Sequence, residues 1–88
     1  MKPSELIAKP EAWTKNTEAR NALGLKTSAL DPDAVSWCLA GAIRKTDAEI
    51  YFPEEYAAFS KSLCWVEFND AESTTHQMVL DKLKEFGL

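Results

Sequence analysis

The sequence predicts a mainly α, small single domain spanning residues 1–88, with three to four short helices around a buried central helix. Its 88 residues fit one small domain, and 45% of them are hydrophobic, including three Trp, two Tyr and four Phe, unlike a disordered chain. In addition, helix-start signals precede apolar stripes of helical period at several places. We therefore expect one core of limited size.

The first 30 residues predict one short helix followed by a less regular segment. Ser4 is a candidate N-cap for a helix whose length Pro10 limits. Beyond it, a turn signal at Asn21–Gly24 precedes alternating apolar and polar residues over Leu25–Leu30. This pattern indicates either a short β-hairpin near residues 14–30 or an ordered loop.

The central helix is predicted to begin at Asp31. Asp is a favourable N-cap, and Pro32 suits the first helical position because its missing N–H would have no partner there. Gly41 costs about 1 kcal/mol relative to Ala in a helix interior, which indicates that another element lies close against the backbone there. Apolar residues on nearly every side predict that the helix is buried: Ala34, Val35, Trp37, Cys38, Leu39, Ala40, Ala42 and Ile43.

Two further helices are predicted in the second half of the chain. Pro53, followed by two glutamates, is typical of a first helical turn, and Cys64–Phe68 is predicted to be a short strand or the end of this helix. Thr74 and Gln77 match a capping box that starts the last helix, and Gly87 suits its C′ position. The apolar faces of the two helices comprise Phe52, Tyr56, Phe59 and Leu63, then Val79, Leu80, Leu83 and Phe86.

Charge and composition narrow the expected partners and location. The formal net charge is −4 and the acidic residues are spread along the chain, whereas binding to nucleic acid depends on clustered Lys and Arg. No apolar run approaches the ~18 residues of a membrane span, and the N-terminus lacks the apolar block of a signal peptide. Two cysteines do not make a disulfide framework. We expect an acidic, cytoplasmic protein that binds neither nucleic acid nor a membrane; its oligomeric state is left open.

Two motifs in the chain resemble a known family. D-P-D-A-V-x-W-C-L-x-G-A at Asp31–Ala42, combined with N-D-x-x-x-x-T-x-x-x-V at Asn69–Val79, resembles the domain-of-unknown-function family 6197, small uncharacterised bacterial and phage proteins. The resemblance extends from Trp13 to the C-terminus. Family members often carry Trp before the Asn-Asp pair and Arg before the Thr, where this chain has Phe68 and Thr74, so a binding role of that Arg does not carry over. The resemblance implies a compact, mostly helical soluble domain, without an established activity.

Catalytic and metal chemistry find little support in the sequence. A nucleophilic Cys38 would need His76, the single histidine, as its base, with Asn69 or Asp70 to orient the ring. However, Cys38 is predicted to lie about two turns inside a helix among apolar residues, where burial disfavours a thiolate. The spacing of Cys38, Cys64 and His76 matches no zinc pattern. We therefore expect Cys38 to be part of the core, and no cofactor.

Three functions remain open. The first is a protein-interaction module, encoded by a phage or mobile element, that binds a host or cognate protein through an acidic and aromatic surface. The second is a small-ligand binding or sequestering protein with a pocket near Trp37, Trp65 and Asn69. The third is a Cys-His thiol hydrolase. The candidate binding residues are Trp37, Trp65, Asn69, Asp70 and His76, although Asn69 and Asp70 are also typical of a turn before the last helix.

Overall fold

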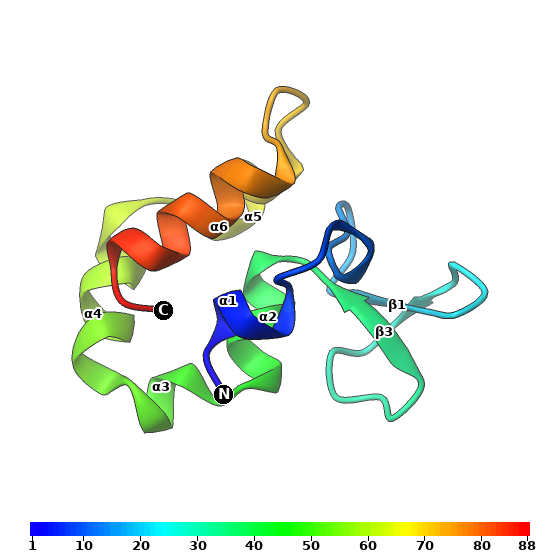
Figure 1. The fold of residues 1–88 in the computed structure, drawn as a ribbon, viewed down its shortest axis with the longest axis horizontal. Helices are drawn as coiled ribbons and strands as arrows, with labels where there is room; N and C mark the ends of the chain where they lie inside the picture. Colours follow the sequence, from blue (N-terminus) through cyan, green and yellow to red (C-terminus); the bar gives the residue numbers. More distant parts are fainter.

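The computed structural model describes residues 1–88 and shows a group of helices with a small sheet at one side (Figure 1). The mainly α prediction is confirmed, but there are six helices rather than three to four. In chain order the elements are α1 (Pro3–Leu6), a 3-10 turn η1 (Pro10–Ala12), β1 (Ala19–Asn21), β2 (Lys26–Thr27), β3 (Ala34–Trp37), α2 (Leu39–Lys45), α3 (Ala48–Tyr51), α4 (Pro53–Ser62), α5 (Trp65–Asp70) and α6 (His76–Glu85).

The three strands form an antiparallel sheet in the order β2-β1-β3. β1 and β2 make the hairpin that was one of the two expectations for residues 14–30, and that alternative is confirmed. The turn between them is held by Asn21, whose Oδ1 accepts hydrogen bonds from the amides of Leu23 and Leu25 at 2.9 and 3.1 Å. Gly24 completes the turn with φ of +79°, a conformation that costs glycine little.

The predicted helix start at Asp31 is wrong, because the side chain of this residue stabilises a turn before β3 instead. Its carboxylate accepts hydrogen bonds from the Asp33 amide and the Thr27 hydroxyl, which ties the loop after β2 to the start of β3. The residues that follow extend as β3 and pair with β1, with Ala19 opposite Trp37. Val35, expected in a helical core, is therefore a strand residue and is 49% exposed.

The central helix is α2, which begins seven residues later than expected, with Cys38 rather than Asp31 as its N-cap. It lies against α1, α3 and α5 and against the end of β3 (Figure 1). Leu39, Gly41, Ala42 and Ile43 are buried. Leu39, Ala42 and Ile43 belong to a single core that also receives Ala19 and Trp37 from the sheet, so the sheet and the helices share one interior.

The second half of the chain follows the predicted helices with local differences. α4 begins at Pro53 as predicted, and Phe59 on its apolar face is fully buried. The segment expected to be a strand or a helix end, Cys64–Phe68, instead enters a separate helix, α5. Asn69 and Asp70 are the last two residues of α5, so the predicted turn at this pair is wrong.

The last helix is capped one residue later than predicted. Thr75, not Thr74, is its N-cap, and its hydroxyl accepts a hydrogen bond from the Met78 amide at 3.2 Å. At the other end Gly87 has φ of +78°, and the amides of Gly87 and Leu88 donate to the carbonyls of Lys84 and Leu83. This is the Schellman arrangement, so the predicted C′ glycine is confirmed. None of the helices combines the length and the apolar character needed to cross a membrane.

Candidate functional site: a groove along α2

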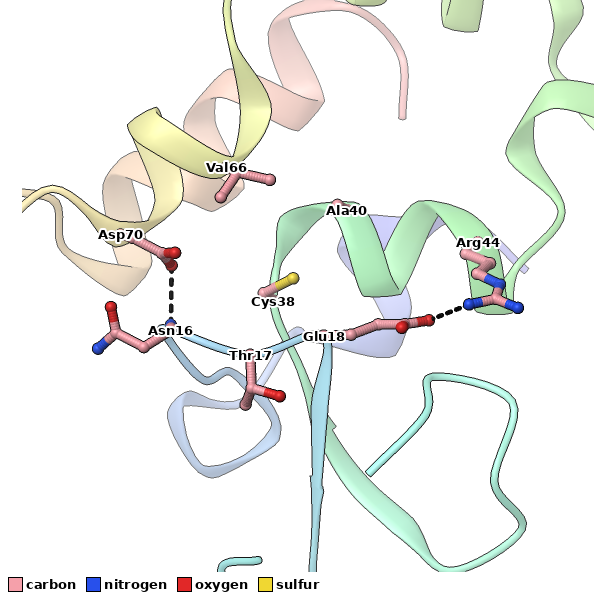
Figure 2. Close-up of a pocket in the computed structure, with 8 residues that line it drawn as sticks. All are labelled: Asn16, Thr17, Glu18, Cys38, Ala40, Arg44, Val66 and Asp70. Atoms are coloured by element: carbon pink, nitrogen blue, oxygen red, sulfur yellow. Dashed lines mark hydrogen bonds and ion pairs between the residues drawn. The ribbon is translucent and has the colours of Figure 1, made fainter. Parts of the chain in front are cut away.

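Two pockets adjoin on the outer side of α2, where both are lined by Ala40 and Arg44. The first, with a volume of about 330 Å³, is called the Cys38 pocket, and the second, of about 210 Å³, the Ile50 pocket. Together they are called the α2 groove. Besides the two shared residues, the Cys38 pocket is lined by Asn16, Thr17, Glu18, Cys38, Val66 and Asp70 (Figure 2), and the Ile50 pocket by Ile43, Asp47, Glu49, Ile50, Tyr56 and Trp65.

One wall of the Cys38 pocket is the segment that leads into β1. The Glu18 carbonyl accepts a hydrogen bond from the Cys38 amide at 3.1 Å. A Cβ atom at Gly41 would lie 2.1 Å from that same carbonyl oxygen, so only a glycine lets the segment approach α2 this closely. The expected close approach at Gly41 is thus confirmed. Across the pocket stands α5, which contributes Val66 and Asp70 (Figure 2).

Asn69 fastens the N-terminal segment to the junction of β3 and α2. Its Oδ1 accepts hydrogen bonds from Trp13 Nε1 at 2.7 Å and from the Leu39 amide at 3.1 Å, and its Nδ2 donates to the Thr14 carbonyl at 3.1 Å. With only 1% of its surface exposed, this side chain is a structural connector. It organises the site without lining it.

Asp70 is hydrogen-bonded to Asn69 through Oδ1 and also lines the Cys38 pocket. Its Oδ1 accepts hydrogen bonds from the Asn16 amide and from Asn69 Nδ2, both at 2.9 Å. The first of these bonds holds the pocket wall at Asn16, a residue with φ of +65° (Figure 2). Asp70 therefore both positions this wall and supplies negative charge to the pocket.

The α2 groove combines exposed apolar surface with negative charge. Ile50 is 70% exposed and Val66 is 57% exposed. Around them the groove has four carboxylates, from Glu18, Asp47, Glu49 and Asp70, and a single guanidinium, from Arg44. Arg44 is already paired with Glu18 at 2.6 Å.

Cys38 is the N-cap of α2, so the expectation that it lies two turns inside a helix is wrong. Its Sγ accepts a hydrogen bond from the Gly41 amide at 3.3 Å. Burial nevertheless raises the pKa of the Cys38 thiol, and the nearby carboxylates of Asp70 and Glu18 raise it further, against the lowering effect of the Gly41 and Ala40 amides. The thiol is therefore neutral near pH 7, an apolar part of the pocket lining.

His76 lies apart from this thiol. Its Nε2 is 2.7 Å from the Ile7 carbonyl, and its ring is 5.8 Å from the ring of Trp13. It does not line the Cys38 pocket, so the two residues of the expected Cys-His pair do not share a cavity. No group of three or more His, Cys, Asp or Glu side chains converges closely enough to hold a metal ion.

Of the five candidate binding residues, the structure brings Trp65 and Asp70 to the groove. Trp37 is 9% exposed and donates from Nε1 to the Ala29 carbonyl at 3.0 Å, inside the core. Like Asn69 and His76, it lines neither pocket of the groove. The sequence prediction missed the other lining residues, among them Glu18, Arg44 and Ile50, because no motif marks them and only the folded chain brings them together.

Comparisons with known proteins add no further assignment. No protein-family model matches this chain, and no curated protein or solved structure is significantly similar to it. The function of the protein is therefore inferred from the α2 groove alone.

Proposed function

We propose that this protein is a protein-interaction module that binds a basic segment of a partner protein in the α2 groove. The observation that carries the proposal is the exposure of Ile50 and Val66 inside a concave surface bordered by four carboxylates. Exposed apolar surface with a polar rim is typical of interaction sites. Complementary charge favours encounter with basic partners and disfavours acidic ones.

The aromatic part of the groove supports the same function. The ring of Trp65 lies 5.6 Å from that of Tyr56 and 5.5 Å from that of buried Phe59. Because these neighbours restrict it, Trp65 offers a large, preformed contact surface that loses little freedom on binding. Large, rigid aromatic side chains are frequent binding hot spots.

Binding of a small ligand is the second candidate. The volume of the Cys38 pocket, about 330 Å³, is at the lower end of the range of roughly 300–1,000 Å³ that ligand sites occupy. The ligand site would then be next to Cys38 and Asp70, rather than next to buried Trp37 and Asn69. A small ligand would leave Ile50 exposed in the neighbouring pocket, whereas a protein segment would cover both pockets, and this difference favours the first candidate.

Membership of family 6197 is part of this proposal. The residues that carry the resemblance are far apart in the sequence but meet at one junction: Cys38 caps α2, Gly41 admits Glu18, and Asn69 accepts a hydrogen bond from the Leu39 amide. A shared structural role at this junction would account for their joint occurrence.

Selection from a displayed library of short random peptides tests the interaction function. We expect the enriched peptides to contain basic and apolar residues and to lose at least tenfold in affinity for the double variant Ile50→Ser/Val66→Ser. The matched control is Leu23→Ser/Leu25→Ser, which changes two apolar residues of similar exposure, 82% and 59%, on the hairpin outside the groove. Enriched peptides that are acidic, or that depend on the hairpin and not on the groove, would contradict the proposal.

A further inference from the structure

We infer that the α2 groove recognises a two-part motif: the Cys38 pocket takes a Lys or Arg side chain of the partner, and the Ile50 pocket takes an apolar one. This inference rests on the interaction function proposed above. It assigns a different ligand chemistry to each end of the same groove.

The Cys38 pocket has an uncompensated carboxylate. Arg44 is paired with Glu18 Oε1 at 2.6 Å, which neutralises that pair. Asp70 accepts two hydrogen bonds from neutral donors through Oδ1, while its Oδ2 accepts none from the protein. The pocket thus presents one net negative charge and a carboxylate oxygen with free acceptor capacity, which suits an ammonium or guanidinium donor.

The rest of the Cys38 pocket fits the stem of such a side chain. Val66, Ala40 and the Cys38 thiol offer apolar surface to methylene groups. Long basic side chains bury their stems against such surface and place the charge at a polar tip. The negative potential reaches the interior of the pocket, since both Asp70 and Glu18 oppose ionisation of the Cys38 thiol.

The Ile50 pocket favours a different side chain. Five of its eight lining residues are hydrophobic: Ala40, Ile43, Ile50, Tyr56 and Trp65. Its carboxylates, Asp47 and Glu49, are on the exposed rim. An aliphatic or aromatic side chain would therefore be buried here between charges that face solvent.

A bare metal ion is a weaker candidate for the Cys38 pocket. Metal sites in proteins draw on several ligating side chains, and no three His, Cys, Asp or Glu residues converge in this structure. A side-chain cation needs only one carboxylate and an apolar passage for its stem, and the Cys38 pocket has both.

Amide chemical shifts in NMR spectra of the full chain test the inference with two small probes. N-acetyl-arginine methylamide carries the cation, and N-acetyl-norleucine methylamide has a neutral, shorter, unbranched aliphatic side chain. We expect the arginine probe to shift the amide signals of Asn16, Cys38 and Val66, and the norleucine probe to shift that of Ile50. In Asp70→Asn the arginine probe should bind roughly fivefold more weakly, the size of a partly exposed ion pair.

The control variant is Glu49→Gln, which removes a carboxylate from the other pocket and should leave arginine binding unchanged. If Asp70→Asn disturbs the fold, Glu18→Gln takes its place and should also weaken the arginine probe. Equal shifts at Asn16 and Val66 from both probes, or arginine binding that neither variant weakens, would overturn the inference. The proposed function would survive that result if selected peptides still required Ile50 and Val66, and it would fail if they did not.

Discussion

The carbonyl oxygen of Glu18 occupies the place where a side chain at Gly41 would begin, 2.1 Å from the position of its Cβ. This contact brings the segment before β1 directly against α2. It also sets the width of the Cys38 pocket, which Glu18 lines. The glycine is therefore a determinant of both the fold and the groove.

Replacing Gly41 with alanine should destabilise the protein. Ala is favoured over Gly by about 1 kcal/mol within a helix, but the added methyl group collides with backbone that cannot rotate away. We expect the free energy of unfolding to fall by about 2 kcal/mol, as for an overpacked core. Urea denaturation monitored by circular dichroism measures the change. A variant as stable as the wild type would show that the segment before β1 moves away at little cost.

Replacing Asn69 with alanine should cost more. The change leaves Trp13 Nε1 and the buried Leu39 amide without their acceptor. We expect a loss of about 3 kcal/mol, the size of two unsatisfied donors. The same denaturation experiment measures it, with Gln77→Ala as the control, because Gln77 makes its side-chain hydrogen bond on the exposed surface of α6. Similar small losses in both variants would contradict the connecting role of Asn69.

The thiol of Cys38 should be protected from alkylation in the folded protein. Burial raises its pKa and only 7% of the residue is exposed, whereas Cys64 is exposed. In a Cys64→Ser background, we expect iodoacetamide to label folded Cys38 much more slowly than the denatured chain at pH 8, as measured by intact-mass spectrometry. Rapid labelling of the folded protein near neutral pH would instead revive the thiol-hydrolase alternative.

The turn before β3 should make the protein sensitive to acid. Hydrogen bonds from the Thr27 hydroxyl and the Asp33 amide lower the pKa of Asp31, so the folded state favours its ionised form. The stabilisation is present above the pKa of the unfolded chain, about 4, and is lost as the pH falls through the lower folded value.

Thermal melts between pH 5 and pH 2 measure this effect. We expect the melting temperature to fall less over that pH range in Asp31→Asn than in the wild type. Glu54→Gln, which makes the same change of charge on the exposed surface of α4, is the control. If the melting temperatures of Asp31→Asn and the wild type fall by the same amount between pH 5 and pH 2, this contribution is ruled out.

The sequence predicts those elements that depend on local signals. Pro53 sets the start of α4, Gly87 the end of α6, and Asn21–Gly24 the hairpin turn, and in each case the local backbone chemistry is sufficient. Asp31 and Pro32 also give a local signal, but a misleading one, because an aspartate can cap a turn as well as a helix. Residues 34–37 are extended because they pair with β1, which is distant in sequence.

The groove is harder to predict for the same reason. Asp70 and Trp65 are recognisable by residue type, and both reach it. Glu18, Arg44 and Ile50 look like ordinary surface residues in the sequence. The contact between Gly41 and Glu18 brings one wall of the groove against α2, and the packing of α3 on α2 places Ile50. Conversely, Trp37 and Asn69 are residue types that often bind ligands, but here their polar groups form hydrogen bonds within the protein.

The central claim, that the α2 groove binds a basic segment of a partner, is most directly tested by fluorine NMR of the protein labelled with 5-fluorotryptophan. Its three tryptophans give one signal each, and Trp65→Phe identifies the signal from the groove. On addition of the tightest peptide from the selection, we predict a shift of the Trp65 signal while those of buried Trp37 and hydrogen-bonded Trp13 stay in place. A bound peptide that leaves the Trp65 signal unmoved would contradict the account.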